Sequence, residues 1–207
     1  MSLPPCRLGP GHESIRSEPQ TQQSGHQSAP SYAGGVPSEQ ERVQVGDRVP
    51  DMDLPDHGGQ RRRLSELVGG DPTLLHFYRG WWCPKERQFF RRLVDLQDDA
   101  EVAYARMVSV SVDPSQVQAA FRAGLDARWT FLSDQDRRYV TELGLLEITD
   151  TVHDPYLPMC LVLTPDLVVH AAYGGYWYWG RPTMAELRQD FRELTRALRP
   201  DWDPPPA

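Results

Sequence analysis

The pattern of apolar and polar residues predicts an alternation of strands and helices between residues 43 and 198. Residues 74–78 form a short, nearly continuous apolar run, which is typical of a strand buried on both faces of a sheet. Residues 104–112 predict a second strand, in which valines alternate with methionine and serine. Two further apolar runs, at 159–164 and 167–173, predict a final pair of strands. Together they predict an α/β sheet with helices on both faces and an antiparallel pair at its end.

Four segments have the periodicity or the capping residues of helices. The first spans about residues 84–97 and places its large apolar side chains on one face. The second spans 113–124, with Asp113 as its expected N-cap. The third lies within 133–144, where we interpret the aspartates as caps rather than acid–base groups. The fourth spans 183–198 and begins with a Thr-x-x-Glu capping box.

Composition separates one foldable domain from two tails. Residues 1–40 are rich in Ser, Pro, Gly and Gln, so we expect a disordered tail that cannot bury enough apolar surface to fold. The domain is expected at 41–200, followed by a short disordered tail at 201–207. The net charge of −7 argues against a nucleic-acid partner. The one basic cluster, Arg61–Arg63, is interpreted as the solvated edge of a small hairpin.

The chain has three cysteines, Cys6, Cys83 and Cys160, at wide spacing. An odd, sparse set is not a disulfide framework, and it fits a reducing cytoplasm. No stretch is apolar enough for a signal peptide or a membrane span, so we expect a cytoplasmic location and no membrane partner. Cys6 lies in the predicted tail, where an incidental cysteine is a simpler interpretation than a resolving thiol.

Cys83 is the candidate reactive residue. Gly80 ends the apolar strand and Pro84 suits the first position of a helix, so Cys83 is expected at a helix N-terminus. Unpaired N–H groups and the positive end of the helix dipole favour the thiolate there, and Arg79 adds positive charge nearby. The alternative is a small buried cysteine that only packs. The redox interpretation requires a sulfur that is ionised near neutrality and reachable by solvent.

The run FYRGWWCP, at residues 77–84, resembles the FYRG-x-WCP pattern of the redoxins and peroxiredoxin-like proteins of the AhpC/TSA families. The resemblance covers roughly residues 43–198. It implies a thioredoxin-like fold with a central mixed sheet. It also implies that Cys83 is the nucleophile, with Arg79 and Pro158 as catalytic partners and Trp82 and Pro84 as supporting residues. Pro158 matches the position of a cis proline that lies beside the active-site cysteine in this fold.

The chain departs from the family pattern around the cysteine. Glu86 occupies the position of the second cysteine in Cys-x-x-Cys, which excludes dithiol cycling at this turn. Glu86 could hydrogen-bond near the sulfur or receive a proton, but an exposed carboxylate that favours the helix dipole explains it as well. His76 and Gly80 stand where Pro-x-x-x-Thr-x-x-Cys has proline and threonine. Cys160 is a candidate resolving thiol, although we favour a packed core cysteine.

Two functions are compatible with this sequence. In the first, the chain is a thiol-dependent oxidoreductase, most simply a one-cysteine peroxidase. Cys83 would then act on a peroxide or disulfide, and an external thioredoxin-like or low-molecular-weight thiol would reduce it. In the second, the chain is a redox-sensing or partner-binding module whose aromatic residues 176–179 contact a partner. We expect no cofactor and no metal, since the six histidines show no paired ligand spacing, and a homodimer is left open.

Overall fold

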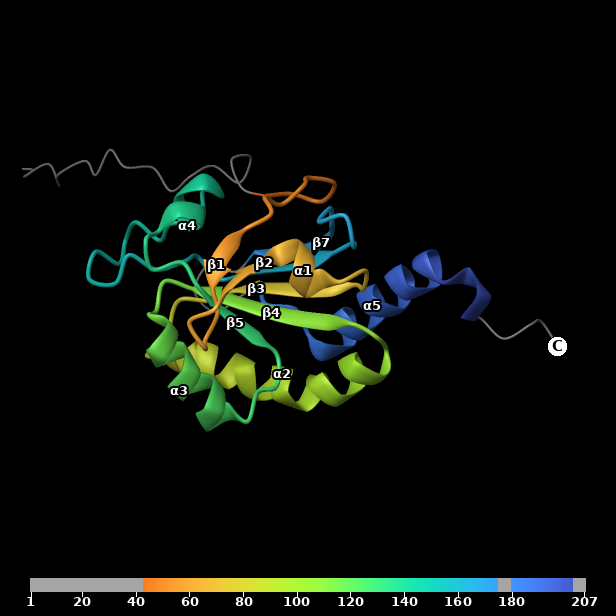
Figure 1. The fold of residues 1–207 in the computed structure, drawn as a ribbon, viewed down its shortest axis with the longest axis horizontal. Coiled ribbons are helices and arrows are strands. Elements are labelled where there is room, and N and C mark those ends of the chain that lie inside the picture. Colours follow the sequence, from red (N-terminus) through yellow and green to blue (C-terminus); the bar gives the residue numbers. More distant parts are fainter. Residues whose placement is uncertain (1–42, 175–179, 203–207) are drawn as a thin grey trace, which may run out of the picture. The chain divides into compact units, whose positions relative to one another are not determined.

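The computed structural model describes residues 43–174 and 180–202. A five-stranded sheet with the strand order β5-β4-β3-β6-β7 lies at the centre of this part of the chain (Figure 1). Its strands are β3 (Thr73–Phe77), β4 (Arg106–Ser111), β5 (Thr130–Ser133), β6 (Met159–Leu163) and β7 (Val169–Gly174). β3, β4 and β5 are parallel, whereas β6 is antiparallel to both β3 and β7. The predicted mixed sheet and its antiparallel final pair are confirmed.

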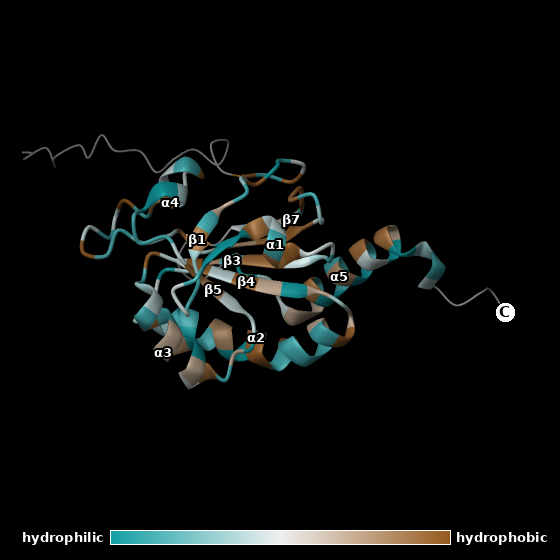
Figure 2. Ribbon diagram, viewed as in Figure 1, coloured by the Kyte–Doolittle hydropathy of each residue, from teal (hydrophilic) through white to brown (hydrophobic). Residues whose placement is uncertain are grey.

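Three helices cover one face of the sheet. They are α2 (Pro84–Val102), α3 (Ser115–Leu125) and α5 (Met184–Leu198), and their inward side chains join one apolar cluster with Leu74 of β3. Apolar and hydrophilic residues alternate along α2, as expected for a helix with one face against a sheet (Figure 2). The capping box predicted for α5 is present, because Thr183 Oγ1 accepts a hydrogen bond from the backbone N–H of Glu186 at 3.2 Å.

The opposite face is covered by shorter elements. α1 (Leu64–Val68) and α4 (Arg138–Glu142) contribute to a second apolar cluster, which includes Leu75 of β3. Consecutive residues of β3 thus face opposite clusters, and all five of its residues are buried. The carboxylate of Asp134 accepts hydrogen bonds from three backbone N–H groups at the start of α4, which confirms the predicted capping role.

A small hairpin precedes the sheet in the chain. β1 (Asp53–Pro55) pairs with β2 (Arg61–Arg63), and the intervening turn is held by Asp56 Oδ1, which accepts from the backbone N–H of Gly58 at 2.8 Å. The arginines of β2 are exposed or half-buried, as expected for a solvated edge. No helix in the described ranges is long and apolar enough to cross a membrane.

Three boundaries differ from the sequence-based expectation. α2 continues to Val102, five residues beyond its predicted end, because Ala100 extends its apolar face. Asp113 is not the N-cap of α3, since Pro114 holds that position. The carboxylate of Asp113 is instead engaged by the turn before Cys83. The chain also continues past α5 in a 3-10 helix at Pro200–Trp202. The predicted tail at 1–40 and the aromatic residues 176–179 lie outside the described residues.

Candidate active site

Cys83 lies at the junction between the central strand and α2. Shortly after β3 ends, Gly80 turns the chain with a φ of +148°, a conformation that residues with a side chain rarely adopt. The backbone N–H of Cys83 donates to the carbonyl oxygen of Gly80 at 3.2 Å, which closes the turn. Cys83 is then the N-cap residue of α2, with Pro84 at the first helical position. The predicted placement of Cys83 at a helix N-terminus is confirmed.

The geometry of Gly80 explains one departure from the family pattern. A Cβ at this position would lie 2.5 Å from Trp82 Nε1 and 3.2 Å from Asp113 Oδ1. The turn therefore has no room for the threonine that the family pattern places here. A hydroxyl that orients the substrate has to come from elsewhere, or the site works without one.

Cys83 is more covered than the sequence suggested. The residue is only 3% exposed, so the expectation of a solvent-reachable sulfur is wrong for this conformation. Its side chain belongs to neither of the two apolar clusters formed by the described residues. Cys83 is therefore buried without belonging to either apolar cluster. This distinguishes Cys83 from a cysteine that merely fills space.

Arg79 and Trp82 form a cluster with the loop that precedes β6. Arg79 Nη2 donates to Asp150 Oδ2 at 2.8 Å, and its guanidinium lies 5.1 Å from the centre of the Trp82 ring. Trp82 stacks on His153 with 3.9 Å between ring centres. Burial opposes ionisation of Asp150, but hydrogen bonds from His153 outweigh it and hold the pKa of that carboxyl below its usual range.

This cluster pairs Arg79 with a carboxylate that the sequence did not indicate. The guanidinium of Arg79 forms an ion pair with Asp150. Among the described residues, Arg79 makes no hydrogen bond to Cys83. The arginine ties the cysteine turn to Asp150 in the loop before β6. Any effect on the thiolate is then a longer-range electrostatic one, weakened by the neighbouring carboxylate.

Glu86 is buried, which corrects the expectation of an exposed first-turn carboxylate. It lies in the first turn of α2 and is 0% exposed. The helical register turns it toward the sheet, where its carboxylate forms an ion pair with Arg181, from the segment before α5. His76 of β3 lies on its other side, with 3.6 Å between Nε2 and Oε2. The residue that replaces the second cysteine is thus the centre of a buried polar cluster.

The protonation states in this cluster follow from burial and charge. Burial lowers the pKa of His76, so the imidazole is neutral near pH 7. Burial would raise the pKa of Glu86, but His76 and the Arg181 guanidinium together hold it below its usual range. A carboxylate and a guanidinium therefore balance each other beneath the first turn of α2. Removing either partner of a buried ion pair lowers the stability of the fold strongly, because the remaining charge is left buried without compensation.

Cys160 has the surroundings of a core cysteine. It lies on β6 opposite His76 in the strand register, is 1% exposed, and joins the apolar cluster that contains Leu74. Burial raises the pKa of its thiol far above the usual value. Both Cys83 and Cys160 are free thiols. These observations support the favoured interpretation of Cys160 as a packing residue rather than a resolving thiol.

Pro158 lies directly before β6, as predicted, but its peptide bond is not cis. The described residues contain no cis peptide bond. The preceding residue, Leu157, donates its backbone N–H to the carbonyl oxygen of Leu145 at 2.6 Å, and Tyr156 pairs with Leu146 in an antiparallel bridge. This pairing guides the chain into β6 along an extended path. The structure thus has a trans bond before Pro158, a question that the resemblance left open.

Three residues of the site were missed from the sequence. Asp113 Oδ2 accepts the backbone N–H of Trp81 at 2.9 Å and holds the turn, and burial raises the pKa of this carboxyl. Asp150 binds Arg79, and Arg181 binds Glu86. The sequence around Asp113 and Asp150 indicates only a helix cap or a turn, and not a contact with the cysteine turn. Arg181 is 95 residues from its partner, so no local pattern could have revealed the contact.

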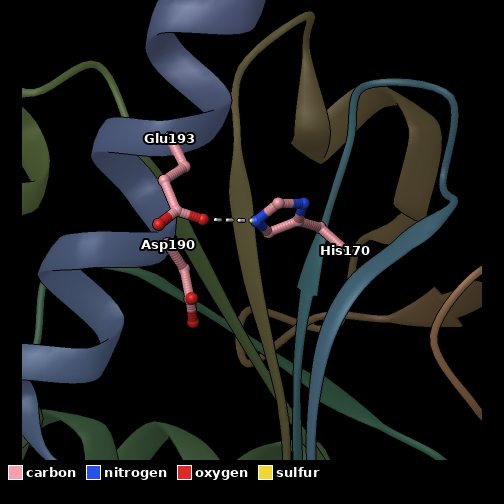
Figure 3. Close-up of side chains that lie close together, drawn as sticks. All are labelled: His170, Asp190 and Glu193. Atoms are coloured by element: carbon pink, nitrogen blue, oxygen red, sulfur yellow. Dashed lines mark ion pairs between the residues drawn. The ribbon is translucent and has the colours of Figure 1, made fainter.

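A separate cluster of potential metal ligands lies between β7 and α5. His170, Asp190 and Glu193 each offer one ligand atom within 4.8 Å of the others. Figure 3 shows Glu193 facing His170 across the gap between helix and strand, with Asp190 turned away from this pair. Asp190 Oδ2 already accepts the hydroxyl of Tyr173 at 2.7 Å. One of the three candidate ligands is thus committed to another partner.

The chain is similar in sequence to a known family and to two curated proteins. The model of the AhpC/TSA family matches residues 45–172, which is more than half of the chain. The candidate peroxiredoxin Rv1608c of Mycobacterium tuberculosis is 36% identical over 106 residues, or 50% of this chain and 67% of that protein. Peroxiredoxin bcp1 of Schizosaccharomyces pombe is 28% identical over 105 residues, or 49% of this chain and 52% of that protein.

Solved structures show the same fold. The crystal structure of peroxidoxin BcpB from Mycobacterium tuberculosis has a TM-score of 0.62 and 24% identity, covering 78% of this chain and all of its own. AhpC from Enterococcus faecalis has a TM-score of 0.63 and 15% identity, covering 78% of this chain and 98% of its own. At these identities the similarity concerns the fold alone. It confirms the predicted thioredoxin-like class.

Proposed function

The chain belongs to the AhpC/TSA family and is a thiol-dependent peroxidase, and on that premise we propose that Cys83 is its nucleophile. The observation that supports this most directly is the position of Cys83 as the N-cap residue of α2, outside both apolar clusters. The positive end of a helix dipole attracts negative charge, which suits a nucleophilic sulfur at this position. In the described part of the chain, Cys160 is the only other cysteine, and it lies in the core.

The proposed reaction uses one cysteine and an external thiol. The Cys83 thiolate attacks the outer oxygen of a hydroperoxide, the O–O bond breaks, and the remaining oxygen leaves as water or an alcohol after taking up a proton. Cys83 becomes a sulfenic acid. An external thiol then displaces water to form a mixed disulfide, and a second thiol releases Cys83 as the free thiol.

The cover over Cys83 favours a peroxide over a disulfide as the oxidising substrate. A hydroperoxide group is small and needs only a narrow approach to the sulfur. A disulfide has to bring two bulky substituents into line with the attacking thiolate. Cys83 is 3% exposed. A hydroperoxide therefore needs only a small fluctuation of the turn to reach the sulfur, whereas a disulfide needs the turn to open.

Glu86, His76 and Arg181 are proposed as positioning residues. They hold the first turn of α2 from beneath, through the Glu86–Arg181 ion pair and the adjacent imidazole. Trp82 and Arg79 hold the other side of the turn through Asp150 and His153. Pro84 fixes the start of the helix, and Pro158 leads into the strand that carries Cys160. None of these residues is proposed to exchange protons with the substrate.

The reductant is proposed to be an external thioredoxin-like protein or low-molecular-weight thiol. Glu86 replaces the nearby second cysteine, and Cys160 is buried with a raised pKa, so neither can resolve the sulfenic acid directly. The sparse free cysteines also fit our proposal of a cytoplasmic setting, where such thiols are abundant.

The function is tested by peroxide consumption with dithiothreitol as reductant. The native chain and Cys160→Ala should consume hydrogen peroxide over many turnovers, whereas Cys83→Ser should not. Loss of activity in Cys160→Ala with a folded protein would contradict the one-cysteine mechanism. A native chain that takes up one oxygen atom and then stops would favour the sensor alternative.

A further inference from the structure

A groove lies where α2 ends, between its last residues and the C-terminal half of α5. One cavity in this groove has a volume of about 240 Å³ and is bordered by Val102, Arg192 and Trp202. A second cavity of about 280 Å³ shares Val102 and Arg192 with it, so the two are continuous. Together they reach the roughly 300–1,000 Å³ range of small-molecule sites. Cys83 lies at the other end of the 19-residue helix α2, roughly 27 Å of helix away, so the groove is separate from the active site.

Arginines give this groove a local positive charge. Arg192 and Arg196 both border the smaller cavity and are four residues apart, so they lie on the same side of α5. Arg192 is exposed and has no ion pair or side-chain hydrogen bond with any described residue. Arg199 also borders the cavity and donates to Asp71 at 2.5 Å, but Asp71 accepts from Arg106 as well, at 2.8 Å. One carboxylate thus serves two guanidinium groups, and the excess positive charge attracts an anion.

Two further donors in the groove have no partner. Thr195 Oγ1 and Arg199 Nη1 belong to residues that line the smaller cavity, and neither has a hydrogen-bond partner among the described residues. No acidic side chain of the described chain lines this cavity, and Asp99 in the adjoining one is already paired with Arg188. The groove therefore offers several donors to one anionic group. This favours a phosphate monoester, which has three terminal acceptor oxygens, over a carboxylate, which has two.

Trp202 places a flat apolar surface beside these donors. It lines the cavity and is 50% exposed. The guanidinium of Arg199 lies 4.5 Å from the centre of the indole ring, and Tyr104 packs edge-on against it with 5.1 Å between ring centres. These contacts hold the indole in position. Val102 adds exposed apolar surface at the end of α2. Tryptophan rings that are held in this way stack on the planar rings of nucleobases.

We propose that this groove binds a nucleoside monophosphate, with the phosphate at Arg192 and Arg196 and the base on Trp202. The inference goes beyond the proposed function and does not depend on it, because the groove is remote from Cys83. Inorganic phosphate would leave the indole uncovered, and a nucleoside would leave the arginines without an acceptor. No Asn, Gln or acidic side chain of the described chain lines the smaller cavity to read the edge of a base. AMP is therefore a suitable probe for the whole class.

The first test measures binding of AMP to the full chain by isothermal titration calorimetry, with adenosine and inorganic phosphate as comparison ligands. AMP should bind at least roughly 10-fold more tightly than either, because each of them makes only one of the two sets of contacts. Equal binding of AMP and phosphate would mean that the arginines hold an adventitious ion only. Equal binding of AMP and adenosine would mean that they hold no phosphate. Either result, or a chain that does not bind AMP, overturns the proposal.

The second test removes the proposed phosphate partners. Arg192→Ala combined with Arg196→Ala should raise the Kd for AMP by roughly 10-fold or more, the loss expected for charge-assisted hydrogen bonds. Arg92→Ala is the control, because Arg92 is an exposed arginine of α2 that lines neither cavity. This control should leave the Kd unchanged. An unchanged Kd in the double variant would contradict the assignment of the phosphate site.

The third test removes the proposed stacking surface. Trp202→Ala should raise the Kd for AMP by roughly 10-fold, whereas Trp202→Phe keeps a ring and should retain most of the affinity. Trp81→Ala is the matched control, because Trp81 is 48% exposed and lies in the turn before α2, at the opposite end of that helix. Equal losses in Trp202→Ala and Trp81→Ala would overturn the assignment. Thermal unfolding without AMP shows that each variant is folded.

These outcomes are independent of the proposed peroxidase. The double variant Arg192→Ala, Arg196→Ala should consume hydrogen peroxide at the rate of the native chain, because neither arginine is part of the cysteine turn. A chain that binds AMP but consumes no peroxide would refute the peroxidase and leave the nucleotide site standing. A chain that consumes peroxide but does not bind AMP would refute the nucleotide site alone.

Discussion

At the scale of the residue, the turn around Cys83 depends on buried charged side chains whose pairing no local sequence pattern indicates. Glu86 stands where related redox proteins have a second cysteine, and it is buried against Arg181 and His76. The substitution exchanges a resolving thiol for a structural carboxylate. In the proposed one-cysteine reaction Cys83 then needs an external reductant, while the Glu86 carboxylate anchors the first turn of α2.

Removal of Arg181 should destabilise the protein strongly. Arg181→Met leaves the buried Glu86 carboxylate without its cation, which costs about 3–5 kcal/mol in the free energy of unfolding. The double variant with Glu86→Leu should recover most of this loss, because it removes both charges from the interior. Urea unfolding of the native chain, both single variants and the double variant measures the effect. Equal stability of Arg181→Met and the native chain would show that the ion pair contributes little.

The buried His76 should make stability depend on pH. Its folded-state pKa is below the unfolded value of 6.5, so the unfolded chain binds a proton first as the pH falls. Stability from this group is full above about pH 6.5 and declines below it. Glu86 adds a separate decline below its usual pKa of 4.5, because its folded-state pKa is also lowered. In His76→Leu the decline below pH 6.5 should become smaller, and the remainder should come from His57, whose pKa burial also lowers. Unfolding at each pH measures both variants, and an unchanged decline would contradict the role of His76.

At the scale of the element, local signals predicted the framework of the site. The apolar run at 74–78, Gly80 and Pro84 were enough to place Cys83 between a central strand and a helix. The capping box at Thr183 likewise placed the start of α5. No comparable local signal marks contacts between distant segments. The burial of Glu86 and the pairing of Arg79 with Asp150 depend on how loops meet in space, and both were missed.

The turn between β3 and α2 should not accept the residue that the family pattern contains. Gly80→Thr restores the threonine of Pro-x-x-x-Thr-x-x-Cys, yet Gly80 has a φ of +148° and a Cβ there would lie 2.5 Å from Trp82 Nε1. We expect lower stability by about 1–3 kcal/mol and slower peroxide reduction. Thermal unfolding and hydrogen peroxide kinetics check this. A gain in activity would mean that the turn adopts another conformation when the substrate binds.

At the scale of the whole molecule, the fold places the proposed reactive thiol and a core thiol on neighbouring parts of the same scaffold. Cys83 lies at the end of the central strand, and Cys160 lies on the adjacent strand β6. The difference between them is one of surroundings, because Cys160 belongs to an apolar cluster and Cys83 does not.

The most direct test of the central claim is the mass of the intact chain after one equivalent of hydrogen peroxide. The native chain and Cys160→Ala should each gain one oxygen atom, located on the Cys83 peptide and removed by dithiothreitol. Cys83→Ser should gain none. A disulfide between Cys83 and Cys160, or oxygen uptake that persists in Cys83→Ser, would contradict the assignment of Cys83 as the single reactive thiol.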